Sequence, residues 1–128
     1  MARAIAGQSS AAGSIYNALT TPDPSTDLKP FVIPTRIDRL TLVPADRQLT
    51  GAEIEMVSLS GREERLRRLV ASVRADNDFV FVDCPPSLGL LTLNALAAAD
   101  ALLVPLQCEF FALEGLSQLL QTVERVQQ

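Results

Sequence analysis

Short apolar runs recur along most of the chain and are separated by helical patterns. Leu40–Val43, Phe79–Val82 and Ala101–Val104 are apolar or β-branched, and each is followed at once by a proline or an aspartate. Runs of this length and composition predict β-strands. Phe79–Val82 has acidic residues on both sides, a pattern typical of a strand that is buried on both faces.

Between and after these runs, apolar residues recur at helical spacing. Thr50 and Glu53 match a capping box, in which two side chains satisfy free backbone donors at a helix start. Ser60 and Glu63 repeat this signal. Residues 90–99 predict an apolar third helix. The positions expected to face the core are Leu66, Leu69, Val70 and Val73 in the second helix, and Leu113, Leu116, Leu120 and Val123 in the last.

The repeated order of strand and helix predicts an α/β fold, with a parallel sheet and flanking helices. Three such βα units are recognisable in residues 40–128, which we expect to form one domain. Residues 1–39 predict an irregular N-terminal segment with one short helix, begun by Ser14 as N-cap. Two prolines, Pro22 and Pro24, place a surface loop after that helix.

Composition narrows the functional classes. The chain has 128 residues, 48% of them hydrophobic, a net charge of −4 and no histidine. Without histidine, Ser-His-Asp and Cys-His nucleophile schemes and most zinc sites are excluded. The negative charge argues against a general affinity for nucleic acid. Two distant cysteines, no signal peptide and no apolar run of membrane-spanning length make a cytoplasmic protein without a membrane partner the expectation.

Asp83 is the most informative candidate for chemistry. In open α/β sheets, ligands bind beyond the carboxyl ends of the strands, and Asp83 comes directly after the run Phe79–Val82. Apolar residues followed by an acid have the form of a Walker B segment, whose carboxylate holds a magnesium ion or its water. An aspartate after a strand is also commonly a loop or capping residue, so the pattern alone leaves both interpretations open.

Longer stretches of the chain resemble the ParA/Soj family, the deviant Walker ATPases that segregate plasmids and bacterial chromosomes. The resemblance covers residues 14–128 and implies a P-loop NTPase-like domain, here incomplete. It is carried by SIYNAL at residues 14–19, LTLVPADRQLTGAEIEM at 40–56, FVFVDCPPSLGLLTLNAL at 79–96 and VPLQCEFFALEGLSQLL at 104–120.

Within this resemblance, Asp83 matches the Walker B aspartate, which would hold Mg²⁺ through water beside ATP. Gly89 would let the loop that follows Asp83 approach the nucleotide closely. For the segment before the last helix, nucleotide contact and a structural or interface role are both open. The matched positions beside Asp83 are Cys84, Pro85, Pro86 and Gly89 in the loop near the nucleotide and the dimer face, and Gln107 and Glu109 before the last helix.

The chain also departs from the family. It has no KGGxGKT phosphate loop, its only lysine is Lys29, and Gly7–Ser9 is a faint remnant of the DxDPQGNA segment. It stops at Gln128, before the segments for adenine contact and DNA binding. We therefore expect a truncated or degenerate copy that does not hydrolyse ATP alone. Without the phosphate-loop strand, Phe79–Val82 would have an uncovered edge and the chain would be marginally stable.

The resemblance implies three partners: a second copy in an ATP-dependent dimer, a ParB-type protein that stimulates hydrolysis, and nonspecific DNA held through a region that this chain lacks. The binding of nonspecific DNA in the family also implies a nucleoid-associated location. The alternatives are a non-catalytic interaction or dimerisation module and a gene fragment without function. The arginines between Arg62 and Arg74 are interpreted as a solvent face paired with Glu63 and Glu64, rather than as a DNA-binding patch.

Overall fold

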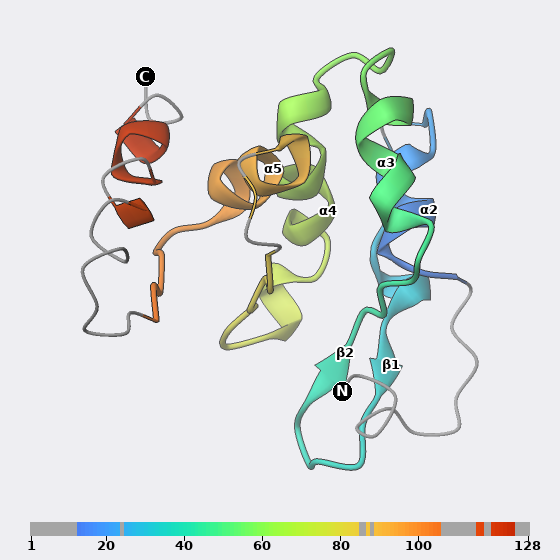
Figure 1. Ribbon diagram of the computed structural model, residues 1–128. Helices are drawn as coiled ribbons and strands as arrows, with labels where there is room; N and C mark the ends of the chain where they lie inside the picture. The colour runs from blue at the N-terminus through green and yellow to red at the C-terminus, as the bar shows by residue number, and fades with distance from the viewer. Residues whose placement is uncertain are drawn as a thin grey trace.

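The computed structural model describes residues 13–23, 25–84, 87, 89–105, 115–116 and 119–124. These residues form helices and a small sheet (Figure 1). The elements are α2 (Ile15–Thr20), η1 (Lys29–Phe31), β1 (Ile33–Pro34), β2 (Thr41–Leu42), α3 (Leu49–Met56), η2 (Arg62–Glu64), α4 (Arg65–Ala71), η3 (Arg74–Asp76) and α5 (Leu90–Ala98), where η denotes a 3₁₀ helix.

Helix α2 begins at the predicted place. Ser14 is its N-cap, in an extended backbone conformation. Oδ1 of Asn17 accepts the backbone N–H of Ser14 at 2.9 Å, so a side chain of the first turn satisfies a donor at the helix start. The prediction of a short helix begun by Ser14 is confirmed.

The two strands form an antiparallel pair. Ile33 of β1 lies opposite Leu42 of β2, and Pro34 lies opposite Thr41. The turn between them contains Arg39 in the left-handed region, with φ of 61°. The predicted strand at residues 40–43 is thus present in part, but its partner is the preceding strand of a hairpin.

Four helices share one core. Helix α2 packs against α3, and α4 packs against α5 and α2. The predicted core positions Leu66, Leu69 and Val73 are buried, which confirms that face of the second helix. The buried apolar residues of this cluster are Ala18, Leu19, Leu28, Ala52, Met56, Leu66, Leu69, Val73 and Ala95.

Both predicted capping boxes are wrong. Helix α3 begins at Leu49 after Gln48, because Oδ1 of Asp46 accepts the Gln48 N–H at 2.8 Å and starts the turn earlier. Thr50 therefore lies inside the helix. At the second predicted box, the N-cap is Gly61, which precedes η2. Its φ of 59° is the left-handed conformation that glycine adopts without strain.

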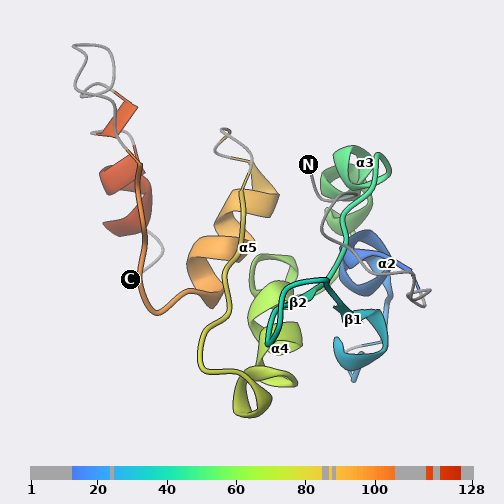
Figure 2. The same ribbon diagram turned by 90° about the horizontal axis from the view of Figure 1, so that it is seen from below.

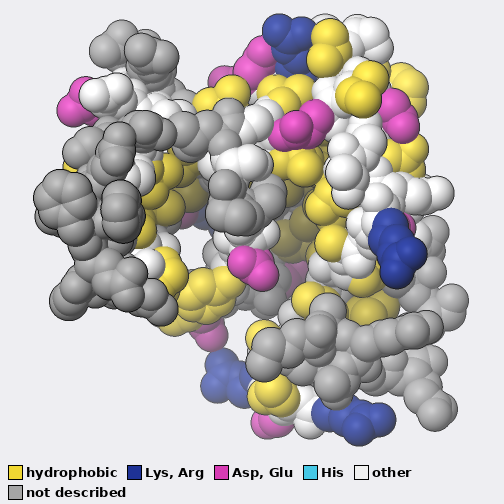
Figure 3. All heavy atoms as spheres, in the orientation of Figure 1, with side chains coloured by type: hydrophobic (Ala, Val, Ile, Leu, Met, Phe, Trp, Pro, Cys, Tyr) yellow, Lys and Arg dark blue, Asp and Glu magenta, His cyan; other side chains and the backbone are white. Residues whose placement is uncertain are grey.

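The segment Phe79–Val82 is extended but is not paired into a sheet with any residue that the structure describes. Phe79 is 80% exposed and Phe81 is 84% exposed, so the expected burial on both faces is wrong for this chain. Burial of a strand needs neighbouring strands at its edges and helices over its faces. Figure 3 shows hydrophobic side chains at the surface around the hollow beside the C-terminal part.

Residues 101–105 lead away from α5 to the C-terminal part, which lies beyond α5 and far from α2 and α3 (Figure 2). Residues 119–124 are helical. Leu113 lies outside the described residues, while Leu120 is 51% exposed. None of the described helices is long and apolar enough to cross a membrane.

Candidate functional site

Asp83 lies at the end of the extended segment and its side chain is exposed. Its neighbour Cys84 is a free thiol whose Sγ lies 3.6 Å from the carbonyl oxygen of Val82. Partial burial of the sulfur, followed by the negative charge of Asp83, raises the pKa of the Cys84 thiol above its ordinary value. Cys84 therefore stays protonated at neutral pH and is a poor nucleophile.

The donor set around Asp83 suits a magnesium ion held in part by water. Among the described residues, no group of three or more Asp, Glu, Cys or His side chains could enclose a metal ion. Mg²⁺ keeps several waters and is commonly bound through one or two carboxylates and the phosphates of a substrate. A single exposed carboxylate at Asp83 fits that mode of binding and does not fit a closed protein cage.

The remaining predicted site residues are only partly described. Gly89 is at the N-cap of α5, in an extended conformation with φ of −82°. Four positions lie outside the described residues, so their predicted roles stay predictions: Pro85, Pro86, Gln107 and Glu109.

Glu53 of α3 contacts the first turn of α5, which sequence reasoning did not assign to the site. Its Oε1 accepts the backbone N–H of Leu91 at 3.1 Å. A Cβ built on Gly89 would lie 2.9 Å from Cδ of Glu53 and closer still to Oε1. A side chain at residue 89 would therefore require the Glu53 carboxylate to move, although the backbone angles there suit any residue.

Asn94 of α5 ties this helix to α4. It is fully buried, and its Oδ1 accepts the backbone N–H of Leu66 at 3.0 Å. Its Nδ2 donates to the carbonyl oxygens of Arg62 at 2.7 Å and of Leu90 at 2.9 Å. The buried amide is thus hydrogen-bonded through both of its ends, which fixes α5 against the start of α4.

Arg65 ties α4 to the end of α2. Only 6% of this residue is exposed, and its guanidinium donates to the carbonyl oxygens of Leu19 and Thr21. Burial lowers the pKa of Arg65, with a smaller contribution from the charge of Arg68. A cation at the C-terminal end of a helix also meets the negative end of its dipole.

The basic cluster is arranged differently from the expectation. Arg65 is buried and is not part of a solvent face. Glu63 pairs with its neighbour Arg62 at 2.8 Å, and Arg68 donates to the carbonyl oxygen of Gly61 at 2.9 Å. The i,i+4 pairs that were expected for Glu63 and Glu64 are absent from the ion pairs of the described residues, so that part of the prediction is wrong.

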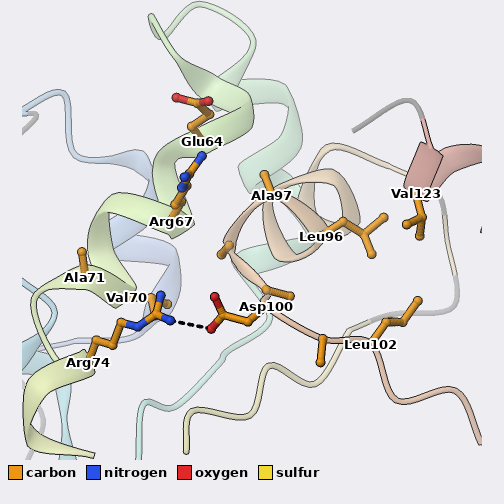
Figure 4. Close-up of a pocket in the computed structure, with 13 residues that line it drawn as sticks. Glu64, Arg67, Val70, Ala71, Arg74, Leu96, Ala97, Asp100, Leu102 and Val123 are labelled. Atoms are coloured by element: carbon orange, nitrogen blue, oxygen red, sulfur yellow. Dashed lines mark hydrogen bonds and ion pairs between the residues drawn. The ribbon is translucent and has the colours of Figure 1, made fainter. Parts of the chain in front are cut away.

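A cavity of about 380 Å³ lies away from Asp83, between α4, α5 and residue 123. Figure 4 shows Leu96, Leu102 and Val123 around it. The ion pair between Arg74 and Asp100, at 2.8 Å, lies at its edge. Because Asp83 is not among its lining residues, this cavity does not extend the candidate site.

Comparison with known proteins relates the chain to the ParA and Soj proteins. A family model described as an AAA domain matches residues 3–128. The chain is 52% identical over 121 residues to the chromosome partitioning protein ParA of Myxococcus xanthus, covering 94% of this chain and 42% of the relative. It is 52% identical over 101 residues to the sporulation initiation inhibitor protein Soj of Bacillus subtilis, covering 79% of this chain and 40% of the relative.

A solved structure supports the fold. The chain superposes with a TM-score of 0.81 and 41% identity on cobyrinic acid a,c-diamide synthase from Mycobacterium smegmatis with bound ATP analogue and magnesium, over 91% of this chain and 46% of that one. This likeness confirms the predicted α/β, P-loop NTPase-like fold. The chain spans less than half the length of the relatives that it matches.

Proposed function

The chain belongs to the ParA/Soj family of partitioning proteins, and we propose that it is the part of a partitioning ATPase that contributes the magnesium-side carboxylate. The observation that carries this proposal is the match of 121 residues at 52% identity to a chromosome partitioning protein. Asp83 falls inside the matched segment that has the Walker B form. ATP and Mg²⁺ are the ligands that follow from it.

Asp83 has a limited chemical role in this proposal. Its exposed carboxylate would hold a magnesium ion through water. The ion would supply positive charge that offsets the charge of the phosphates. Gly89 and the first turn of α5 determine where the chain returns to the folded core after Asp83.

The 128-residue chain alone is proposed not to hydrolyse ATP. Phosphoryl transfer depends on positioning and on charge stabilisation by a cradle of backbone amides and a lysine. The sequence contains no KGGxGKT motif, and its single lysine, Lys29, forms an ion pair with Asp76 at 2.9 Å. Dimerisation, stimulation by a ParB-type partner, nonspecific DNA binding and a cytoplasmic, nucleoid-associated location belong to the same proposal for the whole protein.

A second candidate function is a non-catalytic interaction module. Phe79 is 80% exposed and Phe81 is 84% exposed, which leaves an apolar extended segment available for pairing with another chain. In this case the chain would bind a partner strand with or without nucleotide.

The test is binding of MnATP to the ¹⁵N-labelled chain, because Mn²⁺ broadens the NMR signals of nearby amides. We expect broadening at Asp83, its loss in Asp83→Asn, and no change in Asp38→Asn, an exposed carboxylate of the β1–β2 turn. Equal broadening in Asp83→Asn would overturn the site. Phosphate release from MgATP that depends on Asp83 would overturn the proposed lack of turnover.

A further inference from the structure

The N-terminus of α5 is closed by a carboxylate from another helix. Leu91 is the second residue of α5, and its N–H belongs to the first turn, where backbone donors have no acceptor within the helix. Oε1 of Glu53 supplies that acceptor at 3.1 Å. A carboxylate in this place also meets the positive end of the helix dipole.

Gly89 makes this approach possible. Its φ of −82° is one that any residue adopts, yet a Cβ there would overlap the Glu53 carboxylate. The side chain of Glu53 thus occupies the space directly beside the N-cap of α5. Helix N-termini attract phosphate groups, and at this one the carboxylate of α3 takes the place that an anion would need.

A second contact holds the same short connection. Oγ1 of Thr92, a buried residue of the first turn of α5, donates to the carbonyl oxygen of Ser87. Side chains of the folded core therefore hold Ser87, which lies between Cys84 and α5, and Leu91, which lies two residues after Gly89.

We infer that Glu53 is a positioning residue for the carboxylate at Asp83; this inference rests on the proposed function of Asp83. Six residue steps separate Asp83 from Gly89, and an extended chain spans at most about 3.6 Å per step, or roughly 20 Å in total. Fixing the first turn of α5, which follows Gly89, against α3 limits the region that Asp83 reaches. Glu53 acts through the backbone and does not touch the nucleotide.

The inference predicts that the Leu91 amide depends on Glu53. In Glu53→Ala its hydrogen exchange should be faster by roughly tenfold or more, because the amide loses its acceptor. Glu53→Gln keeps an acceptor oxygen and should restore protection. Glu55→Ala is the matched control, since Glu55 lies on the same helix but accepts the Tyr16 hydroxyl. Unchanged exchange at Leu91 in Glu53→Ala would overturn the contact.

The second readout addresses the site itself. At a fixed MnATP concentration, broadening of the Asp83 signal should fall several-fold in Glu53→Ala, return in Glu53→Gln and stay unchanged in Glu55→Ala. If Asp83 broadens equally in wild type and Glu53→Ala while Leu91 loses protection, Glu53 is only a helix cap and the positioning role is overturned. If wild type shows no broadening at Asp83, the proposed function fails, and the Leu91 exchange still decides whether Glu53 holds α5.

Discussion

The hydroxyl of Tyr16 in α2 donates to the carboxylate of Glu55 in α3, at 2.9 Å from Oε1 and 3.0 Å from Oε2. The two residues are 39 positions apart in the sequence. Their contact lies at the surface and joins two helices whose inner faces meet in the core. The hydrogen bond favours the protonated phenol, because a phenolate has no hydrogen to donate.

This contact predicts a change in the titration of Tyr16. The hydrogen bond to Glu55, then slight desolvation and the negative charge of Glu55, raise the pKa of Tyr16 above its ordinary value of 10.0. A raised pKa in the folded state means that the stabilisation is fully present below pH 10 and is lost as pH rises through the folded-state pKa. Stability should therefore decline above pH 10 in part because Tyr16 ionises.

The chain offers a direct measurement, since Tyr16 is its only tyrosine and it has no tryptophan. The ultraviolet absorbance of the phenolate reports on this residue alone. Glu55→Ala removes the acceptor and the charge, so it should move the titration midpoint down toward the ordinary value, whereas Glu53→Gln, on the same helix, should leave it in place. A midpoint that is identical in wild type and Glu55→Ala would contradict the role of the carboxylate.

Replacement of Asn94 should strongly destabilise the fold. Asn94→Leu keeps a side chain of similar size but leaves the buried Leu66 N–H and Arg62 carbonyl without their partner. An unsatisfied buried group costs about 1–3 kcal/mol, so we expect a loss of roughly 2–3 kcal/mol in the free energy of unfolding. Urea denaturation followed by circular dichroism measures it.

Asn77→Ala is the matched control for that experiment. Asn77 is exposed and makes one side-chain bond to the carbonyl oxygen of Val73, at 2.8 Å. Its loss should cost less than about 1 kcal/mol, because water replaces the partner. Equal losses in the free energy of unfolding for Asn94→Leu and Asn77→Ala would contradict the added cost that we assign to the burial of Asn94.

The pair Gly89 and Glu53 predicts strong coupling between two substitutions. Gly89→Ala should destabilise the wild-type chain, because the added methyl group displaces the Glu53 carboxylate from its hydrogen bond to Leu91. In a Glu53→Ala background the overlap is gone, and the backbone at residue 89 accepts alanine. We therefore expect Gly89→Ala to be close to neutral there, with a coupling energy of about 0.5–1.5 kcal/mol in a double-mutant cycle, the size of the displaced hydrogen bond. Additive costs would contradict the close contact.

The exposed phenylalanines predict self-association. The rings of Phe79 and Phe81 lie 6.3 Å apart and form an apolar patch on an extended segment. An exposed apolar edge of this kind pairs with other chains. Light scattering with size-exclusion chromatography should show a concentration-dependent oligomer, and the double substitution Phe79→Ser and Phe81→Ser should raise the monomer fraction.

Ile54 provides the control for this effect. It is 79% exposed but lies on α3, so Ile54→Ser removes a similar exposed apolar side chain from a helix. The oligomer should persist in this variant. If the wild type is monomeric at all concentrations, the prediction of self-association through Phe79 and Phe81 is wrong.

The sequence was most informative where its signals are local. Ser14 and the helix spacing of Leu66 and Leu69 were found from neighbouring residues, and the structure bears them out. The acceptor role of Glu53 was missed, because its partner is 38 residues away and a capping box with Thr50 was a closer explanation. No pattern in the sequence signals such a pairing between helices.

The prediction that Phe79–Val82 is buried is wrong for a different reason. An apolar run indicates that a segment favours burial, but neighbouring strands and helices must cover it. Within the described residues that cover is missing, and the run stays exposed. The apolar pattern of residues 90–99 predicts a helix but gives Asn94 no role, although a buried polar residue in such a helix indicates a hydrogen-bond network.

The clamp that Arg65 forms on the last carbonyls of α2 limits how this chain can be shortened. A version beginning at Leu40 would lose Leu19 and Thr21, which accept the hydrogen bonds of the guanidinium. It would also lose the packing of α2 against α3 and α4, and the core that these helices share would be opened on that side. Any shorter version intended to fold should therefore keep α2 together with its N-cap, Ser14.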